Sequence, residues 1–563
     1  MKIFLRAAFV GALCGVAVLI ADLLVTASTH GHRFEATRES YLLIGAIGLF
    51  VVVPSAVVGG ILGVLMKDKG LSPIALCPLV FVLAFGGLFL LRDKPRVVPD
   101  GISKAIKAGE RRDVLWLVID TLRADALYGT GAMAADQSWD GSAFPMARNL
   151  GGLAAKATAF HEAEAPSGWT IPSTAGLLTG QHPATLDAHR GLLPAGSDTM
   201  AEVLQAAGWN TIAHIDNTLL DEANGFAAGF DRFIKQSPMD FGWKLKTSHL
   251  IPGGLRANFR HRMHISYSGV DQLVDRALGD LESAGDDPLF LYVHAMDVHT
   301  PYWTPLEDAA LAAAAAGIHA MDGTGRDAAR KDANSLSDGQ KNAIRAQYNA
   351  ELAHVDHEFG RLLDRFDELR GLENAIVVVT SDHGEEFWEH GKMGHGLSLW
   401  GEVVRVPMII FAPKDLMPNP VPRTDEPVSL IDVMPTVADL LKLDAGQEGF
   451  GFAGRSLVPA LRGEALSMRP MHSEQFRLNR TTHRWREGNL VLVDAQLPDN
   501  ERVQRLFDVQ VDPLEAEDLS QERPDELARL QAALAQHLAS LKRGGLAAGG
   551  AQTNSAGLDA LGY

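Results

Sequence analysis

Short apolar runs without a polar break constrain this chain more than any other feature. They lie beyond residue 112, at Val114–Ile119, 289–293, Ile376–Thr380 and 408–411. Strands of this kind belong to sheets that are buried on both faces, and such sheets are mostly parallel. Helical patterns lie between them, for example over residues 199–207 and 343–369. The pattern predicts an α/β sandwich with a largely parallel sheet.

The pattern changes after residue 465. Residues 489–493 and 503–507 predict strands of a small antiparallel sheet, and residues 524–542 have the apolar spacing of a helix. We therefore expect a main body over residues 113–465 and a smaller subdomain over residues 466–543. Residues 544–563 are rich in Gly, Ala and Ser, and we predict a disordered tail there.

The N-terminal part carries three apolar stretches, residues 7–26, 41–66 and 71–91, with a single charge, Asp22, among them. Each reaches the roughly 20 apolar residues that a helix needs to span a bilayer. We expect a membrane region over residues 1–91, with three transmembrane helices, and a polar linker over residues 92–112. The alternative for the first stretch is a cleaved signal peptide, but two more stretches follow, and a cleavage region should be neutral where Asp22 lies.

Charge and cysteine content narrow the function of the main body. The chain has 51 Lys and Arg against 69 Asp and Glu, a formal charge of −18. An acidic body lacks the basic footprint of nucleic-acid binding, so we expect no nucleic-acid partner. The two cysteines, Cys14 and Cys77, both lie in the apolar stretches. The main body therefore has neither a disulfide nor a thiolate metal site.

Polar residues follow two of the apolar strands directly. Asp120 comes after Val114–Ile119, and Asp382 and His383 come soon after Ile376–Thr380. In open α/β sheets, ligands bind beyond the carboxyl ends of the strands. Two carboxylates and an imidazole that meet there suit a divalent cation. Each fragment alone also fits a plain turn or, for Asp120, a helix N-cap.

A third segment, residues 165–180, places Thr170 before a Pro-Ser turn and an apolar helix. A threonine in that position is a plausible N-terminal cap of the helix. The same end of a helix also favours an oxyanion, because its backbone N–H groups and dipole point there. A hydroxyl group held there beside a metal ion is a candidate nucleophile.

Taken together, these pieces resemble the sulfatases and the wider alkaline phosphatase superfamily. The resemblance runs from about residue 113 to 540, with the motifs in the family's order, and leaves the N-terminal stretches outside. It rests on VIDTLRAD (118–125), TIPSTAGLLTG (170–180), TMAEVLQAAG (199–208), HAMDVHTPY (294–302), YNAE (348–351) with VD (355–356), TSDHGE (380–385), GHG (394–396), VSLIDVMPT (428–436) and LFD (506–508) with DP (512–513).

The resemblance implies an alkaline-phosphatase-like fold and roles for individual residues. Asp120, Asp382 and His383 correspond to metal ligands, and Thr170 occupies the nucleophile position beside the metal. His299 and His395 correspond to residues that contact the transferred group or protonate the leaving group. Asp297 would join them, as a ligand of a second metal ion if the site holds two. The implied cofactor is a divalent metal, Zn, Mn or Ca, with one ion expected and two as the alternative.

Three departures from the sulfatase pattern bear on the reaction. Sulfatases place a Cys or Ser at the nucleophile position and oxidise it to formylglycine, which Thr170 cannot form. Thr174 replaces the arginine that follows in the sulfatase motif, and Thr121 replaces the second acid of the usual pair. Threonine as the nucleophile resembles the branch that cleaves phosphoesters, which includes phosphonate monoester hydrolases and membrane-bound phosphoethanolamine transferases.

We therefore expect a metal-dependent hydrolase or transferase that cleaves phosphate or sulfate esters through a covalent Thr170 intermediate. Its partner would be an anionic ester, for example an envelope lipid or glycan. The first alternative is a sulfuric ester hydrolase, and the second is a membrane-tethered pseudoenzyme that binds an anionic glycan or lipid. The membrane-bound relatives imply an extracytoplasmic body, whereas the basic residues that flank the spans mildly favour the opposite orientation.

Overall fold

We describe the fold from a computed structural model of the chain. The structure describes residues 111–129, 146–235, 269–300, 302, 336–444, 451–498 and 501–541. The predicted membrane spans, nearly all of the linker and the predicted tail lie outside these ranges. None of the described helices is both long and apolar enough to cross a membrane.

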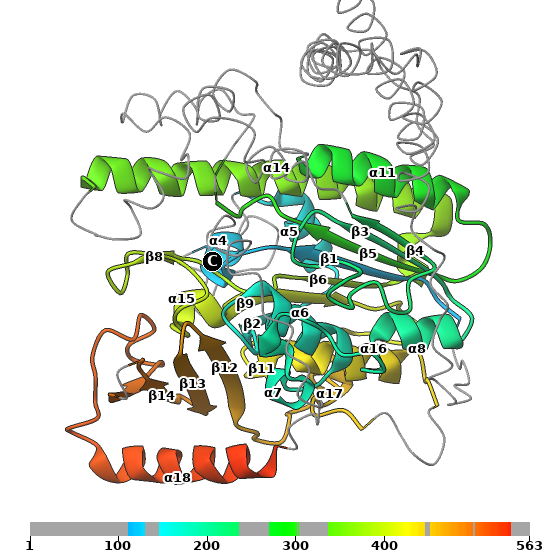
Figure 1. Ribbon diagram of the computed structural model, residues 1–563. Coiled ribbons are helices and arrows are strands. Elements are labelled where there is room, and N and C mark those ends of the chain that lie inside the picture. The colour runs from blue at the N-terminus through cyan, green and yellow to red at the C-terminus, as the bar shows by residue number, and fades with distance from the viewer. Residues whose placement is uncertain are drawn as a thin grey trace, which may run out of the picture. The chain divides into compact units, whose positions relative to one another are not determined.

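A mixed sheet forms the centre of the main body (Figure 1). Among the described residues its order is β10-β2-β9-β6-β1-β5-β3-β4, and β11 also pairs with β2. Strands β6, β1, β5, β3 and β4 are mutually parallel, as predicted, whereas β9 runs antiparallel to both β6 and β2. The strands are β1 Val114–Ile119, β2 Thr158–Glu164, β3 Asn210–Ile215, β4 Arg232–Lys235, β5 Leu289–Ala295, β6 Ile376–Thr380, β9 Arg405–Phe411, β10 Arg423–Thr424 and β11 Val428–Ser429, with a separate hairpin of β7 Glu386–Phe387 and β8 Met393–Gly394.

Helices cover both faces of this sheet, because the strands are apolar on both sides. Alternate residues of β1 point to opposite faces: Leu115 and Leu117 join one apolar core, and Trp116 and Val118 join the other. One face packs against α4 Ala124–Tyr128, α5 Arg148–Ala154, α11 Val270–Ser283 and α14 Asp338–Arg370, and the other against α6 Thr170–Thr179, α7 Pro183–Leu186, α8 Met200–Ala206, α16 Val433–Leu440 and α17 Val458–Leu461 (Figure 1). Shorter elements are η3 Ala188–Arg190, η5 Leu372–Asn374, α15 Gly401–Val404 and η6 Leu430–Asp432.

The predicted helices are confirmed with small shifts of their ends. The pattern over residues 199–207 forms α8, whose cap Thr199 exchanges hydrogen bonds with Glu202 in a capping box. The pattern over residues 343–369 belongs to α14, which begins earlier, after the capping residue Ser337.

The C-terminal part is a four-stranded antiparallel sheet with one helix against it, as predicted. Its elements are β12 Met471–Arg477, β13 Arg480–Glu487, β14 Leu490–Gln496, β15 Arg502–Asp508 and α18 Pro524–Ser540. The sequence pattern predicted β14, β15 and α18 but not β12 and β13. Those two strands carry buried charged residues, among them Glu474, Arg484 and Arg486, which hide the alternation of a strand.

Candidate functional site

The site lies where three neighbouring strands end. Strand β1 lies between β5 and β6 and runs parallel to both, so the carboxyl ends of the three strands meet at one edge of the sheet. Asp120 directly follows β1, and Asp382 follows β6 after one intervening residue. His294 lies near the end of β5, opposite Val118 of β1. The parallel topology therefore brings together side chains from three distant parts of the sequence.

Asp120, Asp382 and His383 form a fully buried cluster, in which one ligand atom from each residue lies within 4.8 Å of the others. The Nε2 atom of His383 lies 3.8 Å from Oδ1 of Asp120 and 3.4 Å from Oδ2 of Asp382. Burial and the nearby charge of Asp120 raise the pKa of Asp382. Burial also acts to raise the pKa of Asp120, but the contact with His294 and the nearby imidazoles outweigh it and lower that pKa to about 2.

The cluster has the chemistry of a cation site. Among the described residues, Oδ1 of Asp120 and Oδ2 of Asp382 are buried and have no hydrogen-bond partner. The Nδ1 atom of His383 lies 3.0 Å from the carbonyl oxygen of Gly384 and so carries the ring proton, which leaves the Nε2 lone pair facing the carboxylates. Buried carboxylate oxygens and a neutral imidazole fit a divalent metal ion. Gly384 is required in this turn, because a Cβ atom there would overlap the backbone of Glu402.

Thr170 is the first residue of α6 and faces this cluster. Its hydroxyl oxygen lies 3.4 Å from Nε2 of His383, and the side chain is fully buried. Trp169, not Thr170, is the N-cap residue of α6, so the alternative of a capping threonine is wrong. Likewise, the N-cap of α4 is Arg123 and not Asp120. The N-terminal end of α6, which favours anions, is therefore beside the predicted nucleophile and metal ligands.

Asn217 connects the predicted nucleophile and metal ligand, and the sequence analysis missed it. Its side-chain amide donates a hydrogen bond to Oδ2 of Asp120 (2.5 Å) and lies 3.4 Å from the hydroxyl of Thr170. His294, also missed, lies 3.6 Å from the same carboxylate oxygen through Nε2. Asn217 follows β3, which pairs in parallel with β5. The strand-end rule that found Asp120 would have found Asn217, had β3 been recognised.

His299 and His395 lie at the same place. The His395 ring centroid is 4.4 Å from that of His383 and 4.9 Å from that of His299. The Nδ1 atom of His395 lies 2.9 Å from Oε1 of Glu385, and both side chains are buried. A carboxylate in this position orients the ring and stabilises its protonated form. The structure therefore brings both predicted histidines to the cluster, with Glu385 as an additional partner.

Asp297 is not part of the cluster of Asp120, Asp382 and His383. Its carboxylate accepts a hydrogen bond from the backbone of Val270 at the start of α11, and it lies close enough to Asp271 and Glu358 for their charges to act on it. Burial and those two carboxylates raise the pKa of Asp297 to about 7. The role of Asp297 as a metal ligand remains a prediction.

Two strained residues hold the turns around the site. Thr121 has a φ of 57° and Val298 a φ of 86°, in the left-handed region that β-branched residues avoid. The Thr121 hydroxyl donates to the carbonyl of Val298 (2.9 Å), so it does not replace the missing second acid as a ligand. The Tyr348 hydroxyl donates to the carbonyl of Thr121 (3.0 Å), and Glu351 accepts from the amide of Val298 (2.9 Å). The YNAE motif therefore fixes the two strained turns.

Two further carboxylates from the recognised motifs act in the scaffold. Asp356 accepts hydrogen bonds from the backbone amides of Asn149 and Leu150 at the start of α5. Asp432 accepts two from Arg469, at 2.6 and 2.7 Å. These contacts assign structural roles to two motifs that carry no catalytic side chain.

A cavity of about 340 Å³ lies beside the loop that carries His395. Its lining is rich in polar and charged side chains from the β7–β8 region and the C-terminal sheet: Glu386, His390, Lys392, Leu397, Ser398, Trp400, Arg480 and Arg505. Burial raises the pKa of Glu386 to about 7, and Lys392, Arg480 and Arg505 place positive charge in the same lining.

Comparison with known proteins identifies the family. The model of the sulfatase family matches residues 112–443. The chain belongs to the sulfatase family. This sulfatase-family chain is 26% identical over 421 residues to a choline-sulfatase of Rhizobium meliloti, an alignment that covers 68% of the chain and 79% of the relative. The family membership makes the protein an ester hydrolase of the alkaline phosphatase superfamily.

Solved structures show the same fold. Phosphonate monoester hydrolases from Silicibacter pomeroyi and Agrobacterium radiobacter align with TM-scores of 0.56 and 0.57, at 20% and 17% identity. The alignments cover 76% and 77% of this chain and 95% of each hydrolase. The predicted alkaline-phosphatase-like fold is thus confirmed for the described residues. Sulfatases typically bind a divalent metal ion, and Asp120, Asp382 and His383 form the candidate site for it.

Proposed function

We propose that this sulfatase-family protein is a metal-dependent hydrolase or transferase that uses Thr170 as its nucleophile, with phosphate or phosphonate esters as the favoured substrates. One observation carries the proposal: the buried Thr170 hydroxyl lies at the N-terminal end of α6, 3.4 Å from His383 and within reach of Asn217. A threonine there cannot become formylglycine, so its own hydroxyl must attack.

The residues of the site divide the chemistry between them. Asp120, Asp382 and His383 would hold a divalent ion, which when bound lowers the pKa of the Thr170 hydroxyl and offsets the charge of the substrate. The Thr170 oxygen attacks phosphorus in line, and the ester bond to the leaving alcohol breaks. His395, paired with Glu385, donates a proton to the departing oxygen. Water or an acceptor alcohol then releases the phosphoryl group from Thr170.

The second candidate is a sulfuric ester hydrolase. The similarity to a choline-sulfatase favours it, because the alignment covers 79% of that relative and is not confined to local motifs. The same residues would then transfer a sulfuryl group, and Thr170 would carry a sulfate ester. A non-catalytic pseudoenzyme is disfavoured, because the cluster of Asp120, Asp382 and His383 is complete and an oxygen of each carboxylate is buried without a hydrogen-bond partner among the described residues.

Parallel assays of phosphate, phosphonate and sulfate esters test the proposal. The purified protein is supplied with Zn²⁺, Mn²⁺ or Ca²⁺ and assayed with p-nitrophenyl phosphate, bis-p-nitrophenyl phosphate, p-nitrophenyl phenylphosphonate and p-nitrophenyl sulfate. We expect Thr170→Ala to lower kcat at least ~10³-fold on every active substrate and Thr170→Ser to retain part of it. Mass spectrometry should show unmodified threonine at rest. Near-wild-type rates for Thr170→Ala would exclude it as the nucleophile.

We also propose that residues 7–26, 41–66 and 71–91 anchor the chain in a membrane, with the hydrolase body on the extracytoplasmic side. The length of the apolar stretches supports the anchoring. A body in that position would meet anionic esters of the envelope, either lipid or glycan.

A further inference from the structure

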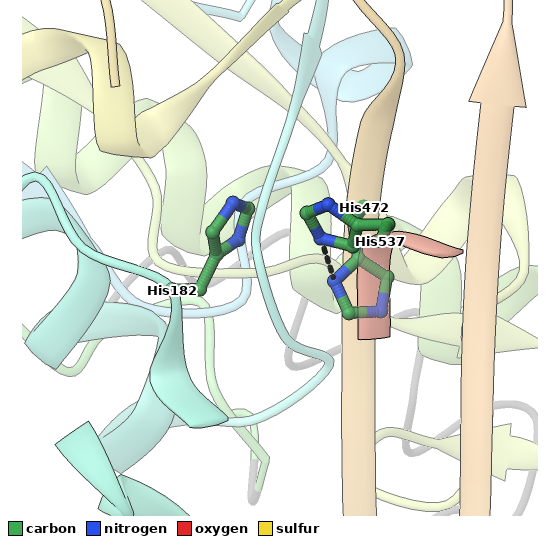
Figure 2. Close-up of side chains that lie close together, drawn as sticks. All are labelled: His182, His472 and His537. Atoms are coloured by element: carbon green, nitrogen blue, oxygen red, sulfur yellow. Dashed lines mark hydrogen bonds between the residues drawn. The ribbon is translucent and has the colours of Figure 1, made fainter. Parts of the chain in front are cut away.

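A group of histidines lies outside the hydrolase site, where the main body meets the C-terminal sheet. His182 precedes α7, His472 lies on β12 and His537 lies on α18. One nitrogen from each lies within 4.8 Å of the others. Figure 2 shows His472 and His537 as a hydrogen-bonded pair, with the His182 ring beside them on the main body. Three segments that are distant in sequence thus direct imidazoles at one point.

The spacing suits a tetrahedral metal ion. The Nδ1 atom of His472 lies 3.2 Å from Nε2 of His537. Imidazole nitrogens bind zinc at about 2.0–2.1 Å, and two such bonds at a tetrahedral angle set the nitrogens about 3.3 Å apart. The observed pair already has this separation. The Nδ1 atom of His182 is buried and has no hydrogen-bond partner among the described residues, which marks it as the third ligand atom.

A second layer of contacts orients the ligands. The other nitrogen of His472, Nε2, lies 3.1 Å from Nδ1 of His483 on β13. If Nε2 carries the proton and donates it to His483, the Nδ1 lone pair of His472 points at the space shared with His182 and His537. Such an outer hydrogen bond fixes the tautomer of a metal-bound histidine.

A buried carboxylate lies next to the three histidines. Glu474, two residues after His472 on β12, is fully buried, and its Oε1 atom lies 3.6 Å from Nε2 of His189. A buried carboxylate beside imidazole nitrogens favours a cation.

We propose that His182, His472 and His537 bind a second metal ion, zinc, which joins the main body to the C-terminal subdomain. Neutral imidazoles prefer zinc or a similar transition metal to calcium or magnesium. A rival set of His472, His483 and Glu474 lies next to it. We favour the first set because Nδ1 of His182 is buried and has no hydrogen-bond partner among the described residues, whereas Nδ1 of His483 already lies 3.1 Å from Nε2 of His472. His182 and His537 are each only half-buried, so a water molecule would complete the tetrahedron.

The position gives this ion a structural role. His182 follows the last residue of α6, the helix that begins with Thr170, by only three positions. Strand β12, which carries His472, also bonds to the segment before Thr170: the Glu474 amide donates to the carbonyl of Pro166 (2.9 Å) and the Ser473 hydroxyl to that of Ala165 (2.6 Å). An ion at His182 would hold the far end of α6 to the strand that supports its near end.

Zinc content of the full-length protein, purified in detergent, tests the proposal. The Asp382→Asn background removes a ligand of the hydrolase site, so that zinc bound elsewhere can be counted. After chelation, zinc loading and desalting, we expect Asp382→Asn to retain one zinc per chain, and Asp382→Asn combined with His182→Ala or His537→Ala to retain none. His357→Ala, on the exposed side of α14, is the matched control and should change nothing.

Two further readouts keep the test independent of activity. In the Asp382→Asn protein, Co²⁺ should give the absorption spectrum of a tetrahedral site, and His537→Ala should abolish it. Zinc should also raise the melting temperature of that protein but not of the His182 variant, whose fold is checked by circular dichroism. Absence of zinc in the Asp382→Asn protein, or equal zinc content in the histidine variants, would overturn the proposal and leave a hydrogen-bonded chain of imidazoles.

Discussion

Asn217 links Asp120 to Thr170. Its amide donates to the carboxylate and lies against the hydroxyl. We expect Asn217→Ala to lower kcat by about 10–100-fold, and metal affinity in the same range, because outer partners of metal ligands have effects of that size. Titration of metal into the chelated variant, with kcat measured at each saturation, separates the two effects. Full activity in Asn217→Ala would show that the amide does not position either group.

The metal ligands and Asp297 can be separated by parallel substitutions. Asp382→Asn and His383→Ala should each lose the metal ion of the hydrolase site, since each removes a direct ligand. Asp297→Asn should keep it, because the structure places that carboxylate at the start of α11. Elemental analysis of the three proteins, counted against the wild type, gives the answer. Loss of an ion in Asp297→Asn would instead support a second catalytic metal.

The residues of the site were predictable where a motif or a strand end marked them. Asp120 and Asp382 follow the apolar runs of β1 and β6. Because these two strands are parallel neighbours, the residues that follow them lie at the same edge of the sheet. Asn217 follows β3, whose sequence includes Asn210 and His214 and lacks such a run. His182 precedes α7 and His537 lies on α18, so neither follows a strand end that would signal their convergence. Only the packing of the two sheets shows that they meet.

At the scale of elements, buried ion pairs connect strand β2 to strand β13. Glu164 of β2 lies 3.2 Å from Arg484 and 3.1 Å from Arg486 of β13, and all three side chains are buried. We expect Glu164→Gln to lower the free energy of unfolding by roughly 1.5–3 kcal/mol, because it removes charge-assisted hydrogen bonds to two buried arginines. Arg484 keeps its pair with Glu515 and Arg486 its pair with Glu162, both at 2.7 Å. Glu282→Gln, which breaks an exposed ion pair with Arg365, is the control and should change stability little.

The same ion pairs predict that the stability of the folded protein decreases at acidic pH. Burial acts to raise the pKa of Glu164, but Arg484 and Arg486 outweigh it and lower that pKa to about 2 in the folded state. An acid with a lowered folded pKa stabilises the protein above its unfolded pKa, about 4.5, and this stabilisation is lost as the pH falls through about 2. Melting temperatures from pH 6 to pH 2 should therefore fall less steeply in Glu164→Gln than in the wild type. Parallel curves would contradict the assignment.

Buried charges explain which strands escaped prediction. Strands β1, β5 and β6 are mostly apolar, and the expected bounds match β1 and β6 and stop two residues short of the end of β5. Strands β2, β12 and β13 are partly or largely buried as well, but they carry charged side chains that pair with other elements, as Glu164 of β2 does with Arg484 of β13. Those partners cannot be inferred from a local sequence window, so the alternation of a strand is not visible in it.

For the whole molecule, the proposed N-terminal anchors predict that the hydrolase body lies on the extracytoplasmic side of a membrane. A fusion of alkaline phosphatase or green fluorescent protein after residue 112 reports it directly. We expect phosphatase activity without fluorescence, as an extracytoplasmic body requires. The basic residues near the spans oppose this orientation only modestly. Six would lie on the outer side and four on the inner side: Arg33, Arg38, Arg92, Lys94, Arg96 and Lys104 against Lys2, Arg6, Lys67 and Lys69. Fluorescence without phosphatase activity would place the body in the cytoplasm.

The contact of β12 with the loop before Thr170 also bears on when, during synthesis of the chain, the hydrolase site can become active. The side chain of Gln475 donates to the carbonyl of Gly396, beside His395, so one late strand supports both the nucleophile loop and a histidine loop. A ribosome has made every candidate ligand of the hydrolase site well before it reaches that strand. Until β12 has been made, the nascent chain therefore contains all the candidate residues of the hydrolase site but lacks the strand that supports their loops. The hydrolase would become active only near the end of synthesis, after the three proposed N-terminal anchors have entered a bilayer.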